Sequence, residues 1–185
     1  MNIFEAIIQR RSIRAWTNES VKDEDIKSIL EAGRWSPSPL NSQPWHFIVV
    51  KNKKTIEILS KDAKEGSFLK FAPIIIVVTS EKKIVSESDQ KNSNRLNLIN
   101  WLEKHNQYHL SAACALQNMW LAALNLGLGA CWVTLDKNSS QKLLKIPKEK
   151  EVIGCLALGH TLGNPLPHKD SDRKPLSEIV SYEKY

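Results

Sequence analysis

The sequence predicts a layered domain of the α+β or α/β class, built on a central sheet. Three observations support this class. Helical and strand-like patterns alternate along the chain, two short apolar runs have the length of buried strands, and 42% of the 185 residues are hydrophobic. A chain of this length fits one domain, so we expect residues 1–185 to form a single unit.

The N-terminal quarter contains two predicted helices and a loop. Residues 3–9 carry their apolar side chains on one helical face. A second helix is expected after Ser20, which can cap it, and acidic residues in its first turn suit the helix dipole. Prolines at 37 and 39 end that helix, because proline disfavours helical geometry in the residue before it. The stretch 36–44 is therefore predicted to be an extended, rigid loop.

Two buried strands and a helix form the next part of the pattern. The strands are predicted over 46–50 and 73–80, with a helix over 54–63 between them. Residues 81–95 are the most polar part of the chain and are expected to form an exposed connection. A further helix is predicted to begin at residue 96.

A long helix over 109–127 dominates the second half of the chain. It is apolar nearly all round, which is typical of a helix at the centre of a core or shared with a partner subunit. A strand at 130–134, a short helix near 139–146 and a strand at 152–159 complete the alternation. The last residues of the chain have few core positions and are predicted to form an arm.

Charge and composition exclude several classes of protein. The formal net charge is +6, but the lysines are mixed with acids and form no basic stripe, which favours a solvated surface over a nucleic-acid site. The longest apolar run, 73–78, is far shorter than the roughly 18 residues of a membrane span. Three widely spaced cysteines without a CxxC motif indicate free, buried thiols in a reducing cytoplasm.

Motifs for side-chain catalysis are missing from the sequence. The GxG at 127–129 lacks a third glycine and precedes a strand where a dinucleotide fold needs a helix. His105 and His109 have i,i+4 spacing, but a predicted helix break separates them, so no metal site is predicted. With no nucleophile, metal or acid–base pair, we expect the chemistry to belong to a cofactor, which the protein binds and orients.

Several segments together carry a family resemblance. Two lie in the first quarter of the chain, "RRSIR" at 10–14 and "PSPLNSQPW" at 37–45. Three more follow later in the chain, namely "LQNMWLAALNLGLGACWV", "IGCLALGH" and "DRKPLSEIV". This pattern resembles the nitroreductase family of FMN-dependent oxidoreductases over essentially the whole chain. The resemblance implies an α+β fold with a mixed central sheet flanked by helices. It also implies an intertwined homodimer with flavins at the interface.

The resemblance also implies a set of cofactor-binding residues. Arginines offer a fixed fork of donors to phosphate oxygens, and one of them would stabilise charge on the reduced flavin. By position, the FMN-binding residues of the first segment and the C-terminus are Arg10, Arg11, Ser12, Arg14 and Arg173, with Arg14 beside the flavin ring. Taken alone, the three N-terminal arginines could equally form a solvated basic surface.

Two further segments complete the implied site. The family's proline-rich loop reaches the flavin of the other subunit, and a later segment offers backbone N–H groups to flavin N5. The matching residues are Pro37, Ser38, Pro39 and Asn41 in the loop and Thr134, Leu135 and Asp136 after the predicted strand. Asn41 is expected to brace the loop rather than to touch the flavin. Taken alone, the segment 37–41 favours a simple helix-to-strand turn, and only its combination with the other segments favours the flavin loop.

The implied activity is a ping-pong reaction with no catalytic side chain. NADH or NADPH would deliver hydride to FMN, and the reduced flavin would then pass it to a nitroaromatic, a quinone or a similar small acceptor. Three alternatives stay open at this point. They are a flavin-binding module for storage or sensing without turnover, a reductive dehalogenase, and a flavin-destroying relative. A homodimer in the cytoplasm, without nucleic acid or membrane, is the expected setting.

Overall fold

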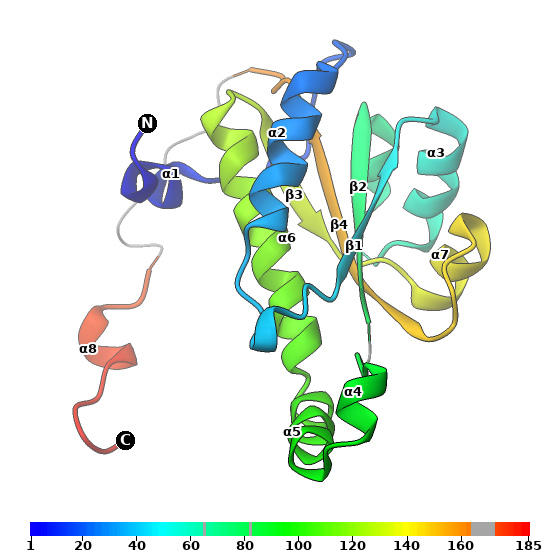
Figure 1. The fold of residues 1–185 in the computed structure, drawn as a ribbon. Coiled ribbons are helices and arrows are strands. Elements are labelled where there is room, and N and C mark those ends of the chain that lie inside the picture. The colour runs from blue at the N-terminus through cyan, green and yellow to red at the C-terminus, as the bar shows by residue number, and fades with distance from the viewer. Residues whose placement is uncertain (65, 82, 164–172) are drawn as a thin grey trace.

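The computed structural model describes residues 1–64, 66–81, 83–163 and 173–185. Its central feature is a four-stranded sheet in the order β1-β2-β4-β3 (Figure 1). The strands are β1 (Trp45–Val50), β2 (Ile74–Glu81), β3 (Gly129–Val133) and β4 (Lys150–Gly159). All three strand pairings are antiparallel, and an isolated bridge between Ser12 and Ala130 adds a parallel element. The predicted α+β arrangement is confirmed, but the four described strands pair antiparallel and do not form the mixed sheet that was expected.

Helices cover both faces of the sheet (Figure 1). One face carries α2 (Asp23–Arg34) and α6 (Gln107–Asn125), and the other carries α3 (Lys53–Asp62), α7 (Lys137–Leu144) and the short helix η2 (Ser67–Phe71). Strand β2 contributes side chains to both helical layers, because successive side chains of a strand point to opposite faces of the sheet. Ile76 and Val78 point into the α2–α6 layer, whereas Ile75 and Val77 point into the α3–α7 layer.

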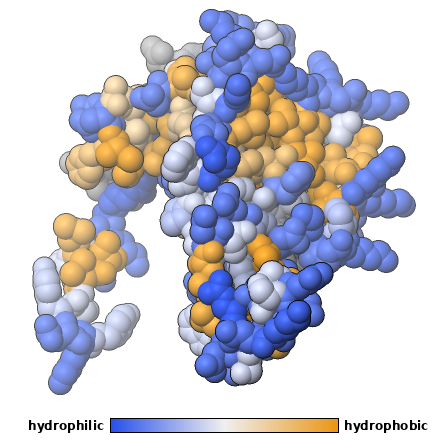
Figure 2. All heavy atoms as spheres, in the orientation of Figure 1, coloured by the Kyte–Doolittle hydropathy of each residue, from blue (hydrophilic) through white to orange (hydrophobic). Residues whose placement is uncertain are grey.

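Two terminal helices stand away from this body (Figure 1). They are α1 (Ile3–Gln9), which has a capping box between Asn2 and Glu5, and α8 (Leu176–Ile179). The predicted helix over 3–9 is confirmed. Its apolar face is not covered within the chain, since Ile3 and Phe4 are 74% and 68% exposed. Figure 2 shows hydrophobic side chains on the outside of both helices and also beside β1.

Helix α2 begins later than the sequence suggested. Its N-cap is Lys22, which makes no side-chain capping bond, so the prediction of a Ser20 cap is wrong. Val21 is buried in the core, which moves the start of the helix beyond the serine. In place of a capping bond, the carboxylates of the first turn, beginning with Asp23, stabilise the helix by their favourable interaction with its dipole.

The loop 36–44 is folded rather than extended, contrary to prediction. It contains a turn of 3₁₀ helix, η1 (Pro39–Asn41), and Leu40, Asn41 and Gln43 have positive φ of 57°, 51° and 44°. The hydroxyl of Ser38 accepts a hydrogen bond from the Gln43 N–H at 2.9 Å, which closes the turn. Side-chain bonds of this kind compete with extended backbone and leave no periodic signal in the sequence.

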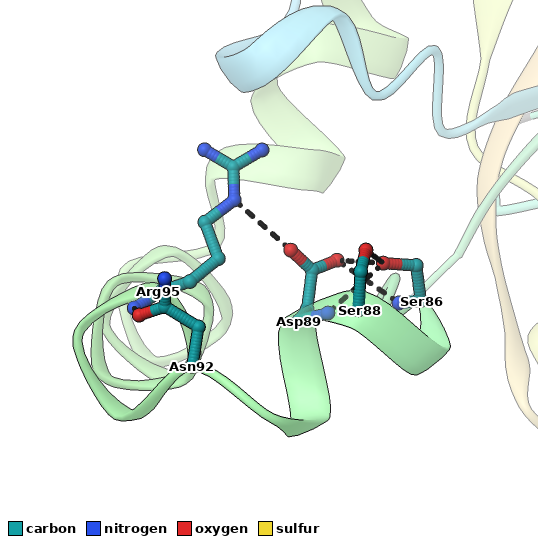
Figure 3. A network of polar contacts seen from close by, with 5 residues as sticks. All are labelled: Ser86, Ser88, Asp89, Asn92 and Arg95. Atoms are coloured by element: carbon teal, nitrogen blue, oxygen red, sulfur yellow. Dashed lines mark hydrogen bonds and ion pairs between the residues drawn. The ribbon is translucent and has the colours of Figure 1, made fainter.

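The polar connection after β2 contains more structure than predicted. It forms α4 (Glu87–Gln90) and α5 (Ser93–Lys104), so the second helix starts three residues before the predicted position. Figure 3 shows the polar network that joins them. Asp89 accepts hydrogen bonds from the Ser86 N–H at 3.0 Å and the Ser86 hydroxyl at 2.6 Å, and it pairs with Arg95 Nε at 3.0 Å. None of the described helices is long and apolar enough to cross a membrane.

Candidate functional site

The arginine-rich N-terminal segment is bonded to the edge of the sheet. The N–H of Ile13 donates to the Ala130 carbonyl of β3 at 3.0 Å, and the indole N–H of Trp16 donates to the Gly129 carbonyl at 2.9 Å. The N–H of Thr17 donates to the His160 carbonyl just after β4, also at 2.9 Å. These bonds hold residues 12–17 across the sheet and fix the direction in which the arginines project.

Close approach between this segment and β3 depends on Gly129. A Cβ at this position would lie 2.4 Å from Thr161 Cγ2 and 2.8 Å from Ile13 Cγ2. Contacts that short do not occur between carbon atoms, so either the segment or the 161 turn would have to move. Glycine is therefore required here for space, because it lets the N-terminal segment lie against the strand.

Arg10 lies against α6 within electrostatic reach of two other guanidinium groups. Arg10 Cζ lies 4.4 Å from the centroid of the Trp120 ring of α6, which is a cation–π contact. The pKa of Arg10 is lowered first by burial and then by the positive charges of Arg173 and Arg11. Like charges at this spacing repel each other, and an anion among them would relieve that repulsion. The electrostatic effect of Arg173 on Arg10 is in line with a shared site, and the assignment of Arg173 to that site stays a prediction.

Arg11 and Arg14 differ from Arg10 in their surroundings. One terminal nitrogen of Arg11 donates to the carbonyls of Ile8 and Arg10, each at 2.9 Å, and so stabilises the end of α1. Arg14 projects from the other side of the segment, and its Cζ lies 5.6 Å from the Phe68 ring centroid. The two residues are thus held in place before any ligand arrives.

Cys131 is a part of this site that the sequence did not identify. It lies on β3 and is 3% exposed, beneath the arginines. Burial raises the pKa of its thiol, while Arg14, Ser12 and Arg10 act in the opposite direction. The thiol is thus neutral at physiological pH, and its polarisable sulfur atom lies next to Ser12. The prediction of buried thiols holds for Cys131 and Cys155 but is wrong for Cys114, which is exposed on α6.

The proline-rich loop lies elsewhere on the chain. Its first residue, Ser36, accepts a hydrogen bond from the Asn118 amide of α6 at 2.7 Å. Asn118 and Trp120 are about 200° apart around the helix axis, so the loop and Arg10 contact different sides of α6. Within one chain the structure therefore does not bring the predicted loop residues and the arginines together. Pro37, Ser38, Pro39 and Asn41 stay with the η1 turn.

The third predicted segment connects β3 to α7. Leu135 is buried in the α3–α7 layer, and Thr134 is exposed. Asp136 is the N-cap of α7 and accepts a hydrogen bond from the Ser139 N–H at 2.9 Å, which lowers the pKa of the aspartate. The Asp136 carboxylate is therefore engaged in capping, and any role in ligand binding would fall to the backbone of this segment.

The residues of the arginine group fit a phosphate-bearing cofactor. Guanidinium groups converge from both ends of the chain, and Ser12 beside them is exposed and offers a hydroxyl. No group of three histidine, cysteine or acidic side chains that could hold a metal ion occurs within the described ranges. The chemistry of the donor set is thus that of an anion site.

Comparison with protein families gives a match over most of the chain. The model described as "Nitroreductase family" matches residues 7–160. A protein described as "Putative NADH dehydrogenase/NAD(P)H nitroreductase" from Methanothermobacter thermautotrophicus is 32% identical over 171 aligned residues, which cover 89% of this chain and 80% of that protein. An "Iodotyrosine deiodinase" from Hydra vulgaris is 30% identical over an alignment that covers 92% of this chain and 69% of that protein.

The fold is also found among solved structures. A structure described as "a putative nitroreductase in complex with fmn", from Desulfovibrio desulfuricans, superposes with a TM-score of 0.77 at 32% sequence identity. The superposition covers 100% of this chain and 98% of the other. The similarity therefore extends over the arginine segment, the η1 loop and the C-terminal Arg173 together.

Proposed function

This chain belongs to the nitroreductase family, and from that premise we propose that it is an FMN-dependent oxidoreductase that takes electrons from NADH or NADPH. The acceptor would be a small molecule such as a nitroaromatic or a quinone. The observation that carries the proposal is the convergence of Arg10, Arg11 and Arg173 beside the exposed Ser12. The FMN named in the Desulfovibrio structure supports the same cofactor here.

In this proposal the protein binds and orients, and FMN supplies the redox chemistry by accepting two electrons and releasing them to the acceptor. Arg10 and Arg173 would donate to the phosphate oxygens, with Ser12 adding a shorter neutral donor. Arg14, held over Phe68, would lie at the ring of the cofactor and stabilise negative charge there. The segment Thr134–Leu135–Asp136 would contribute backbone N–H groups. No side chain of the site would need to change its protonation state.

We also propose that two copies of the chain form the working unit. The α1 helix leaves its apolar face uncovered, and α6 carries a second uncovered stripe. Its members recur at helical spacing, with Leu110 at 56% exposure, Cys114 exposed and Leu121 half-buried. A second copy would cover both surfaces and would bring the η1 loop of one chain toward the arginines of the other. The separation of loop and arginines within one chain supports this arrangement.

A reducing, cytoplasmic setting is part of the proposal. All three cysteines are free, and the two buried thiols sit on the neighbouring strands β3 and β4 without forming a disulfide. Free thiols are typical of proteins kept under reducing conditions.

The first test is an absorbance spectrum of the purified protein before and after anaerobic addition of NADPH or NADH. We expect flavin bands that bleach on addition, and the faster donor identifies the preference. Steady oxidation of the donor with an added quinone then separates turnover from storage of flavin. Flavin bands that persist with both donors would leave a binding module, and failure to take up added FMN would overturn the cofactor assignment.

A second candidate function is reductive dehalogenation, which the 30% identity to the Hydra deiodinase favours. The test is release of iodide from iodotyrosine by the reduced holoprotein, beside quinone reduction by the same sample. Iodide release faster than quinone reduction would favour this second function.

A further inference from the structure

A cavity of about 1000 Å³ opens at the end of the sheet where β1 leads into α3 (Figure 1). Its walls come from three parts of the chain that are distant in sequence. They are the N-terminal segment 14–21, the stretch 51–57 that begins α3, and the stretch 68–74 that ends η2 and begins β2. A volume of this order accommodates a drug-sized molecule. The arginine group described above shares a single lining residue with it, Arg14.

The wall of this cavity is largely apolar and includes aromatic side chains. Trp16 and Phe68 both line it, with ring centroids 6.2 Å apart and planes inclined at 38°. Trp16 is fixed by its hydrogen bond to Gly129, so one of the two rings cannot turn freely. Phe71, which is 63% exposed, stands at the opening. Rigid aromatic surfaces of this kind bind flat apolar groups with little loss of conformational entropy.

The charges that line the cavity are strongly unbalanced. The cations are Arg14, Lys51, Lys53 and Lys70, and the acidic residue in the lining is Glu57. Lys51 is already paired with Asp23, and Glu57 lies 4.0 Å from Lys61.

Two lysines are then available to a ligand. Lys53 has no ion pair among the described residues, and Lys70 Nζ lies 5.0 Å from the Phe71 ring centroid at the opening. Positive charges around a wall of low dielectric constant concentrate anions.

We propose that this cavity binds a small aromatic anion, with a flat ring against Trp16 and Phe68 and a carboxylate or phosphate held by Lys53 and Lys70. The proposal goes beyond FMN binding, because the two lysines lie outside the arginine group, and the cavity adjoins the proposed FMN site at Arg14 and Phe68. Two sources share this chemistry, namely an aromatic acid and the adenosine phosphate end of a nucleotide. Both present a planar ring and a negative group within a few ångströms of each other.

The test uses the holoprotein saturated with FMN and measures binding by isothermal titration calorimetry. The probes are 2-naphthoate and its neutral counterpart 2-naphthylmethanol, with adenosine 2′,5′-bisphosphate as the nucleotide probe. We expect one molecule of naphthoate per chain, with an affinity at least about tenfold higher than that of the alcohol, since charge-assisted hydrogen bonds of this type contribute on that order. Tighter binding of the bisphosphate than of naphthoate would identify the nucleotide source.

The double variant Lys53→Gln/Lys70→Gln should lose most of the preference for the anion while keeping its flavin absorbance. Its matched control is Lys142→Gln/Lys148→Gln, which removes the same charge from exposed positions in and after α7. If both double variants bound naphthoate equally weakly, the preference for the anion would come only from general attraction by a chain of net charge +6. That result would overturn the proposal. Equal affinity for naphthoate and the alcohol, or no binding of either anion, would also overturn it.

Discussion

Arg10 is the residue on which the candidate site is centred, because it contacts α6 and lies within electrostatic reach of both ends of the chain. The sequence indicated the arginines and Ser12 through their spacing. It did not indicate Cys131 beneath them or the bonds that fix Arg11 to the end of α1. The place of Cys131 depends on which strand the segment pairs with, about which a local pattern carries no information, and the Arg11 bonds depend on the rotamer of a single side chain.

Replacing Arg10 with glutamine should weaken FMN binding by roughly ten- to a hundredfold, the range for one lost charge-assisted hydrogen bond. Quenching of flavin fluorescence during a titration of the apoprotein measures the change. Arg34→Gln is the control, since Arg34 is exposed and paired with Glu31 in α2. Unchanged affinity in the Arg10 variant would remove this residue from the phosphate site.

At the scale of elements, the sequence located all four strands and the principal helices, because β2 and β4 are apolar runs and α2, α3 and α7 have clear amphipathic periodicity. It missed the short helices η1, η2, α4 and α8. Two of them are held by side-chain bonds, η1 by Ser38 and α4 by Ser86 and Asp89. Such bonds follow from individual residues rather than from a repeating pattern.

The contact between the N-terminal segment and β3 can be tested through Gly129. The change Gly129→Ala should destabilise the protein by about 1–3 kcal/mol, because the added carbon has no space between Ile13 and Thr161. It should also weaken FMN binding by displacing the arginines. Urea denaturation gives the first quantity and the flavin titration the second. Gly127→Ala is a useful comparison, since no atom lies within 4 Å of a Cβ there and only its φ of +77° opposes the change.

The α4–α5 network predicts a dependence on pH. Hydrogen bonds from Ser86, followed by the interaction with Arg95, hold the pKa of Asp89 below its usual value. A carboxyl group whose pKa is lower in the folded state than in the unfolded state stabilises the folded state at pH values above the unfolded pKa of about 3.9. This stabilisation is lost as the pH falls through the pKa that the group has in the folded state. Hydrogen exchange in residues 86–95, corrected for intrinsic rates, should therefore stay constant from neutral pH to about 5 and increase below about 4. In Asp89→Asn it should be faster throughout and should lack this transition.

At the scale of the whole molecule, the chain leaves apolar surfaces on α1, α6 and beside β1 uncovered (Figure 2). Monomeric proteins rarely expose contiguous apolar patches larger than a few hundred Å². Phe4 and Leu110, two members of these surfaces, are 68% and 56% exposed. The sequence suggested a shared helix at α6 but gave no sign that α1 would stand clear of the sheet.

The dimer proposal predicts the behaviour of Ile7→Glu. Ile7 is 51% exposed on α1, and a charge there should prevent a second copy from covering the helix. We expect sedimentation equilibrium to give a dimer for the unaltered protein and a larger monomer fraction for the variant, with weaker FMN binding in parallel. Ile58→Glu on α3, at 39% exposure, is the control for an added surface charge. An unaltered protein that sediments as a monomer would contradict the proposal.

The pairing of Trp16 with Gly129 spans 113 residues, and Arg173 lies further along the chain. The arginines at positions 10, 11 and 14 are synthesised long before the strand that orients them, and Arg173 is synthesised later still. A nascent chain therefore cannot assemble this anion site until all of these segments have been made. Loading with a cofactor is then a step that follows translation, and the supply of cofactor acts on finished chains only.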